Sequence, residues 1–407
     1  MYLVESKGGA IVCMLLAIIF LGTWPAIMNF LERRGRHPQH TNLDDSIASL
    51  LVATIIALTI GQIGNSTPDV PNFTTQIFQN NWPCVLFAMA GGIFQGLGNL
   101  TTQYAWAFVG LSVTEVITSS IAVVVGTTLN YFLDEQINRA AILFFGVGCF
   151  IVAVFLGAAV HFSNAADNEV KLSNVSNTCN EKEKAIEIPG FKKIFPHKDG
   201  HKDLEQEAVH AQKAIVGSAE FLRQLENRRA IKVFGKRKLI GLGIAFFSGL
   251  CFSLYSPAFN MATNDYWQTM KEGIPHLVVY TAFFYFSVSC SMTTIILNIR
   301  FLYHPILNLP KSSLHAYLND WSGRTLALLA GLLCGLGNGL QFIGGQAAGY
   351  AAADSVQALP LVSTLWGIIL LGEYRRSSKR TYILLGSMLF MFSVATGLLM
   401  ASSGQRK

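Results

Sequence analysis

Ten long apolar segments dominate this sequence of 407 residues. Each runs for roughly 17 to 27 residues, long enough for an α-helix to cross a hydrocarbon core of about 30 Å. Only 13% of the residues are charged, whereas a soluble domain carries about 25%. The sequence therefore predicts an all-α integral membrane protein with ten transmembrane helices. The ten segments are Gly9–Asn29, Ile47–Ile63, Trp82–Phe108, Ser112–Leu133, Ala140–His161, Leu239–Ala262, His276–Ile299, Thr325–Ala348, Ala352–Leu371 and Thr381–Ala401.

Two glycine-rich stretches of the sequence resemble each other. Ala90–Asn99 matches Leu329–Asn338 in the positions of three glycines and an asparagine. A polar stretch separates five apolar segments from the other five. Because five is an odd number, a duplicated half must enter the membrane in the opposite sense, so the pattern predicts a 5+5 inverted repeat. We expect a first five-helix repeat over 1–162, a cytosolic and largely disordered loop over 163–238, and a second repeat over 239–407. An amphipathic helix is expected within the loop, around Ala214–Ile231.

The distribution of Lys and Arg predicts the orientation of the chain. With the central loop in the cytosol, 25 of the 30 basic side chains lie on the cytosolic side, as the positive-inside rule requires. Both termini are then extracellular. The second outer loop has no Lys or Arg and contains two glycosylation candidates, Asn65 and Asn72.

Several classes of function find no support in the sequence. The net charge of +6 is confined to loops, so no nucleic-acid partner is expected. Six of the seven cysteines lie in apolar segments and no Cys/His spacing suits a metal, so neither a metal nor another cofactor is expected. Gly235-Lys236-Arg237 lacks the glycine spacing and the Ser/Thr of a phosphate-binding loop, so no nucleotide binding is expected. Nothing resembles a covalent catalytic site, and the protein is not expected to be an enzyme.

Two acidic residues are the only charges predicted inside the ten segments, away from their ends. Glu115 and Asp354 are also equivalent in the two repeats, 239 positions apart. A carboxylate is costly in a membrane, so each is predicted to couple transport to protons, to bind substrate or to act at a gate. An alternative for Glu115 is structural, because Ser112-x-x-Glu115 has the spacing of a helix capping box. If each acid lies one turn into its helix, inversion places the two at mirrored depths, as two gates.

Neutral polar and aromatic side chains accompany the acids along the same segments. Amides and hydroxyls suit a neutral heterocycle that carries N–H and carbonyl groups, and aromatic rings can stack on it. For any single residue, the alternative is a hydrogen bond that holds two helices together. Three prolines are predicted to mark helix hinges: Pro25, Pro257 and Pro360. The predicted substrate-binding residues are Trp24, Gln103, Thr118, Tyr255, Asn338, Gln341 and Gln357.

Three stretches identify the sequence as similar to the plant ureide permeases: Ala107–Thr118, Gly337–Phe342 and Gly345–Pro360. The similarity extends along nearly the whole chain, the central loop excepted. It implies a ten-helix secondary transporter with an architecture similar to that of drug/metabolite transporters. Its substrates would be allantoin and related oxo-heterocycles such as uracil and xanthine, imported with protons as the coupling ion. The resemblance also implies the plasma membrane as its location, with endomembranes as the alternative.

Two other functions remain open from the sequence. One is an exporter or exchanger of other small solutes, of the drug/metabolite type. The other is a non-transporting membrane receptor or scaffold whose partner binds the central loop. In the favoured interpretation the partners are a small neutral heterocyclic substrate and the lipid bilayer.

Overall fold

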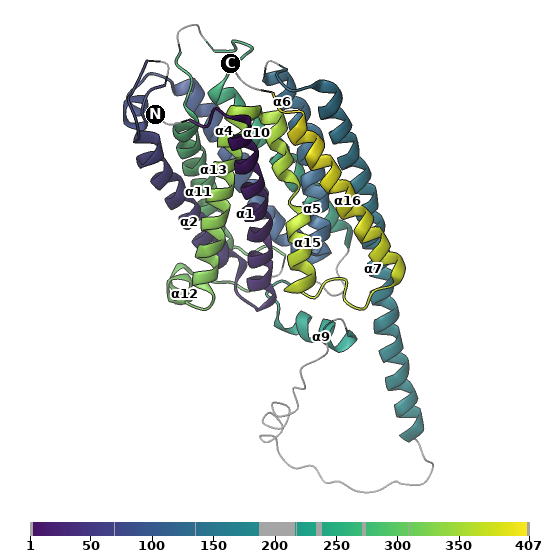
Figure 1. Cartoon of the computed structure of the whole chain (residues 1–407). Coiled ribbons are helices and arrows are strands. Elements are labelled where there is room, and N and C mark those ends of the chain that lie inside the picture. Colours follow the sequence, from purple (N-terminus) through teal and green to yellow (C-terminus); the bar gives the residue numbers. More distant parts are fainter. Residues whose placement is uncertain are drawn as a thin grey trace.

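A computed structural model of the chain describes residues 3–68, 70–134, 136–186, 216, 218–232, 238–270, 274–307 and 309–404. In this part of the chain every regular element is helical, and ten helices are long and apolar enough to cross a membrane. This confirms the predicted all-α fold with ten spans. Both termini lie at one end of the helical bundle, and the short helices α9 and α12 lie at the other end (Figure 1).

The first three spans are α1 (Lys7–Arg33), α2 (Pro38–Leu58) and α4 (Trp82–Val109). The fourth consists of α5 (Leu111–Ile121), the π-helical stretch η2 (Ala122–Thr127) and α6 (Thr128–Leu133). The fifth is the first part of α7 (Ala140–Ile186), over Ala140–Lys171. The last five spans are α10 (Lys238–Thr263), α11 (Val279–Tyr303), α13 (Arg324–Ala348), the ninth span and α16 (Lys379–Ala401). The ninth is divided into α14 (Tyr350–Ala353), η3 (Asp354–Gln357) and α15 (Pro360–Ile369). Short helices are η1 (Ile60–Gln62), α3 (Phe73–Ile77), α9 (Ala219–Arg228) and α12 (Leu314–Asn319).

The apolar pattern predicts that the second span begins at Ile47. In the structure, helix α2 begins nine residues earlier, at Pro38. Proline at the first helical position costs nothing, because its missing N–H would have no partner there. The first turns of α2 are polar but buried, so hydropathy does not detect them. Asp44 and Asp45 therefore lie inside a span, and the expectation that only Glu115 and Asp354 are charged there is wrong.

The central region is more helical than predicted. Helix α7 continues to Ile186, well beyond the predicted end at His161. Helix α9 lies within the stretch predicted to form an amphipathic helix. Residues 187–215, where most of the disordered loop was expected, lie outside the described residues. The division of the chain into 1–162, 163–238 and 239–407 stays a prediction.

The end of the central region binds the end of α1. The guanidinium of Arg229 donates to both carboxylate oxygens of Glu32, at 3.2 and 3.1 Å. The backbone N–H of Ile231 donates to the same carboxylate at 2.9 Å, and that of Ala230 to the Glu32 carbonyl at 3.1 Å. These four bonds fix the segment that follows α9 beneath the bundle.

Glycines bring pairs of helices into backbone contact at equivalent places. A Cβ on Gly92 of α4 would lie 2.0 Å from the Phe286 carbonyl oxygen of α11. A Cβ on Gly331 of α13 would lie 2.2 Å from the Asp45 carbonyl oxygen of α2. Only glycine permits such approaches between membrane helices. Because Gly92 and Gly331 correspond in the two halves, the contacts agree with the 5+5 inverted repeat, which stays a prediction together with the drug/metabolite-transporter-like architecture.

The prolines and the glycosylation candidates have defined places. Pro25 lies inside α1 and Pro257 inside α10, while Pro360 is the first residue of α15. Asn65 lies in the connection between α2 and α3, and Asn72 is the residue before α3. Hinge motion at the prolines and glycosylation at the asparagines stay predictions.

Replacing Gly92 with valine is expected to destabilise the bundle, because the new side chain collides with backbone that cannot move aside. Overpacking of this kind costs about 1–3 kcal/mol. The control is Gly148→Val on α7, where a Cβ meets no atom within 4 Å. Thermal unfolding in detergent measures both variants. Equal melting temperatures for the two would contradict the close approach of α4 and α11.

Candidate functional site

A cavity lined by Glu115, here called the Glu115 cavity, lies between α1, α4, α5, α10, α13 and the ninth span. Five of its lining residues belong to the predicted site: Trp24, Glu115, Tyr255, Asn338 and Gln357. The structure thus brings together side chains that are far apart in the sequence. The other residues of the lining are Leu21, Gln95, Asn99, Thr102, Phe252, Cys334 and Leu359.

A chain of hydrogen bonds orients the polar groups at one wall of this cavity. Gln357 Nε2 donates to the Tyr255 hydroxyl at 2.6 Å, and that hydroxyl donates to Gln341 Oε1 at 3.0 Å. Among the described residues, two buried acceptor atoms of the lining have no partner: Gln95 Oε1 and Asn338 Oδ1. The donor Gln341 Nε2 also has no partner, but Gln341 accepts from the Tyr255 hydroxyl and is not itself a lining residue. The lining can therefore accept hydrogen bonds from the N–H groups of a ligand.

Glu115 is buried and is held by a tryptophan. The indole N–H of Trp106 donates to Glu115 Oε1 at 2.7 Å, and the Trp106 ring meets the Trp24 ring edge to face at 5.5 Å. Glu115 does not cap α5. Glu373 does so instead, accepting from the N–H of Leu111 at 3.2 Å and from the Ser112 hydroxyl at 2.8 Å. The capping-box alternative for Glu115 is therefore wrong.

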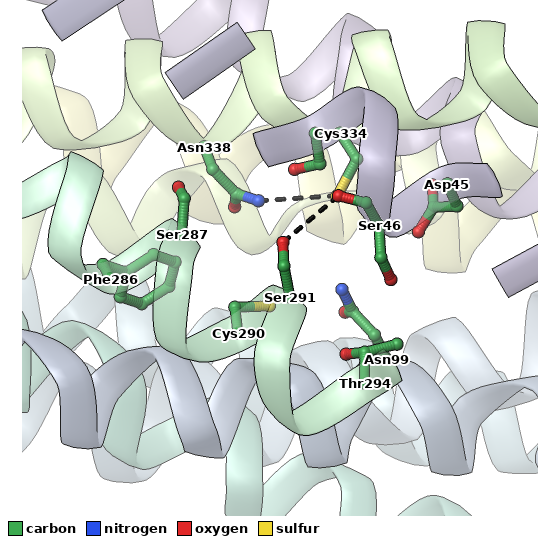
Figure 2. Close-up of a pocket in the computed structure, with 11 residues that line it drawn as sticks. Asp45, Ser46, Asn99, Phe286, Ser287, Cys290, Ser291, Thr294, Cys334 and Asn338 are labelled. Carbon is green, nitrogen blue, oxygen red and sulfur yellow. Dashed lines mark hydrogen bonds between the residues drawn. The ribbon is translucent and has the colours of Figure 1, made fainter. Parts of the chain in front are cut away.

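Figure 2 shows a second cavity, here called the Asp45 cavity, whose lining shares residues with that of the first. Trp24, whose ring lines the Glu115 cavity, donates its indole N–H to Asp45 Oδ1 at 2.8 Å. Sequence reasoning missed Asp45 because it placed the start of the span after it; Pro38 was the signal that could have corrected this. The lining of the Asp45 cavity is Asp45, Ser46, Ser49, Asn99, Phe286, Ser287, Cys290, Ser291, Thr294, Cys334 and Asn338.

The two cavities share part of their lining, and both are small. They share Asn99, Cys334 and Asn338. Each has room for about one water molecule, so a heterocyclic ring would enter only after the surrounding helices move apart. No Lys or Arg is among the described residues that line either cavity.

Four of the predicted site residues lie outside both linings: Gln341, described above, and Thr118, Gln103 and Asp354. Thr118 donates to the Thr114 carbonyl of its own helix at 2.9 Å, and Gln103 is buried outside both cavities. Asp354 accepts from Asn130 Nδ2 at 2.9 Å, and Asn130 also donates to Ser256 at 2.8 Å. The two acids that correspond in sequence therefore have separate surroundings.

Two equivalent turns, at Gly110 and Gly349, connect the neighbouring spans. Their φ angles are 92° and 93°, a region that favours glycine. Each turn is followed by a helix whose first N–H group donates to an acid from the other half of the chain. After Gly110, Leu111 N–H donates to Glu373. After Gly349, Tyr350 N–H donates to Asp134 at 2.8 Å. Glu373 also pairs with Arg33 at 2.7 Å.

An ion network closes the end of the bundle near α12. Asp44 pairs with Arg36 at 2.6 Å and with Arg324 at 3.4 Å. Asp320 pairs with His40 at 2.7 Å. Burial alone would raise the pKa of Asp320, but the hydrogen bond from His40 and the charge of Arg36 together hold that pKa below its ordinary value. These charges are thus satisfied within the network, unlike Asp45 and Glu115.

Ten helices that can cross a membrane, with polar cavities between them, are typical of secondary transporters for small molecules. The family described as Ureide permease matches residues 41–402. Ureide permease 2 of Arabidopsis thaliana is 66% identical over 407 residues, covering 100% of both chains. The probable ureide permease A3 of Vigna unguiculata is 62% identical and covers 94% of this chain and 100% of its own. The chain belongs to the ureide permease family.

Replacing Glu373 with alanine is expected to destabilise the fold, because it leaves Arg33 and the first N–H groups of α5 without their acceptor. Donors left unsatisfied in a buried position cost about 1–3 kcal/mol, and the donors here are partly buried. Glu373→Gln keeps an acceptor oxygen, so its stability should fall less. Glu5→Gln, at an exposed position, should be as stable as the wild type. Thermal unfolding in detergent ranks the three. An unchanged melting temperature for Glu373→Ala would argue against the cap.

Proposed function

We propose that this protein imports ureides such as allantoin, and related oxo-heterocycles such as uracil and xanthine, together with protons. Its family supports a ureide transporter. The observation that carries the finer proposal is the lining of the Glu115 cavity, with unpartnered acceptor atoms on the buried amides of Gln95 and Asn338 beside aromatic rings.

The chemistry of these substrates complements that lining. Each is uncharged and presents ring N–H groups and carbonyl oxygens. The N–H groups would be donors to Gln95 Oε1 and Asn338 Oδ1. Gln341 Nε2 lies outside the lining and would donate to a carbonyl only once the surrounding helices have moved apart. Trp24 and Tyr255 supply aromatic faces for stacking. A strongly anionic substrate would instead call for a buried cation.

Proton coupling is proposed from the buried carboxylates. Glu115 and Asp354 each accept from neutral donors, so neither is neutralised by a direct ion pair among the described residues. Such a group favours proton uptake when it is closed off from water. Each acid takes up a proton or accepts a substrate N–H, and the two halves alternate in access around Pro25 and Pro257. In this proposal the termini are extracellular and the protein works in the plasma membrane, with endomembranes as the alternative.

The central test is radiolabelled allantoin uptake across pH, with uracil and xanthine as competitors. For the wild type we expect uptake that rises as the outside becomes more acidic. Glu115→Gln and Asp354→Asn should each reduce uptake about tenfold or more and flatten its pH dependence, because an amide cannot carry the proton. Normal transport by both variants, with unchanged pH dependence, would refute the roles of the acids. Outward flux without gradient dependence would instead favour an exporter or exchanger.

Deleting residues 187–215 separates a transporter from a scaffold. The described helices contain both cavities without this stretch, so a transporter should keep much of its uptake. A scaffold that acts through the central loop should lose its function. The deletion leaves α7 and α9 intact. Complete loss of uptake, with normal protein level at the membrane, would count against the proposal.

A further inference from the structure

We propose that Asp45 carries a coupling proton in a site of its own, in addition to the roles proposed for Glu115 and Asp354, and that Trp24 links this site to the bound substrate. This inference rests on the proposed function, since it places a further proton site next to the cavity proposed for the heterocycle. It gives a role to a carboxylate that neither the sequence pattern nor the roles proposed for Glu115 and Asp354 include.

The environment of Asp45 leaves its charge uncompensated. The residue is 2% exposed, and among the described residues Trp24 is its only hydrogen-bond donor. Its neighbour in the chain, Asp44, has two arginines and the Tyr317 hydroxyl. A buried carboxylate with a single neutral donor is costly as an anion, and protonation removes that cost.

The lining of the Asp45 cavity suits a proton better than a ring. Five of its side chains are hydroxyls, on α2 and α11, and Phe286 is its only aromatic group. Hydroxyls can relay a proton to and from water, while the Glu115 cavity has the amides and rings for the heterocycle. Asn338 contributes an unpartnered Oδ1 atom to the shared wall. The hydroxyl residues are Ser46, Ser49, Ser287, Ser291 and Thr294.

The titratable groups that face Asp45 are few. They are Asp44 on its own helix, Cys290 on α11 and Cys334 on α13. Helices α1 and α4 present Trp24 and Asn99, which do not titrate in water. No cation among the described residues lines the cavity to stabilise the ionised form of Asp45.

Trp24 joins the two cavities in one side chain. Its ring lines the Glu115 cavity, while its N–H binds Asp45. Its ring also meets Trp106, whose N–H holds Glu115. A substrate that stacks on the Trp24 ring would therefore move the indole N–H that donates to Asp45. When Asp45 takes a proton from hydronium outside, one O–H bond forms and water is left; release to water inside reverses the step.

The test uses the full chain in liposomes and two assays of radiolabelled allantoin. One measures net uptake driven by a pH gradient, and the other measures exchange of external for internal allantoin without a gradient. Asp45→Asn is the informative variant, because its amide oxygen still accepts from Trp24 but cannot titrate. Asp45→Glu keeps a titratable group, and Glu5→Gln is the control for an exposed acid.

For Asp45→Asn we expect gradient-driven uptake to fall about tenfold or more, while exchange stays within about twofold of the wild type. Asp45→Glu should retain more gradient-driven uptake than Asp45→Asn. Equal loss of uptake and exchange in Asp45→Asn would overturn the inference, since Asp45 would then serve substrate binding or folding. Unchanged uptake would overturn it as well, and so would gradient-driven uptake by Asp45→Glu no better than that of Asp45→Asn. A wild type that neither takes up nor exchanges allantoin would refute the proposed function itself.

Discussion

The cost of burying a carboxylate among membrane helices shapes this protein. One group of acids is satisfied by cations or by backbone N–H groups: Asp44 by two arginines, Glu32 by Arg229, and Glu373 by Arg33 and the start of α5. Glu32 lies in the last turn of α1, Glu373 in a connection and Asp44 in the second turn of α2, and each holds neighbouring segments together. A second group has only neutral donors, and two of its members, Asp45 and Glu115, line the cavities. The same chemical group thus serves structure in one setting and, in the proposed function, proton or substrate binding in the other.

Close contacts between helix backbones fix the relative positions of the helices, and with them the place of the polar cavities. Gly92 sets α4 against α11, and Gly331 sets α13 against α2. Asn99 and Asn338, seven residues further along those two helices (99 − 92 and 338 − 331), then face the cavities. Seven residues are about two helical turns, so each glycine and its asparagine lie on one helix face. The repeated sequence motif therefore positions both the packing surface and the polar lining.

Much of the architecture could be predicted from the sequence, because spans are encoded by hydropathy over a whole helix length. The gathering of Trp24, Glu115, Tyr255, Asn338 and Gln357 in one cavity could be anticipated from their polarity within apolar segments. Their precise partners could not, because these depend on the rotation of each helix about its axis.

Three other features could not be predicted from the sequence: the burial of Asp45, the cap on α5 and the length of α7. Asp45 was missed because residues 38–46 are polar and become buried only through contacts with distant segments. The cap on α5 comes from Glu373, more than 250 residues away in the chain, whereas the Ser112-x-x-Glu115 spacing can only describe a local cap. The continuation of α7 to Ile186 is also invisible to hydropathy, since that part of the helix is polar.

The last turn of α1 is held from two directions at once. Glu32 binds the segment after α9, and Arg33 binds Glu373 next to α5. Consecutive residues point about 100° apart around a helix, so turning α1 toward one partner pulls it from the other. Two turns before this fixed end, Pro25 lacks an N–H, so one backbone hydrogen bond of α1 is missing. If α1 cannot turn about its axis at this end, its bending would be concentrated at that proline, one residue from Trp24, which lines one cavity and binds the acid of the other.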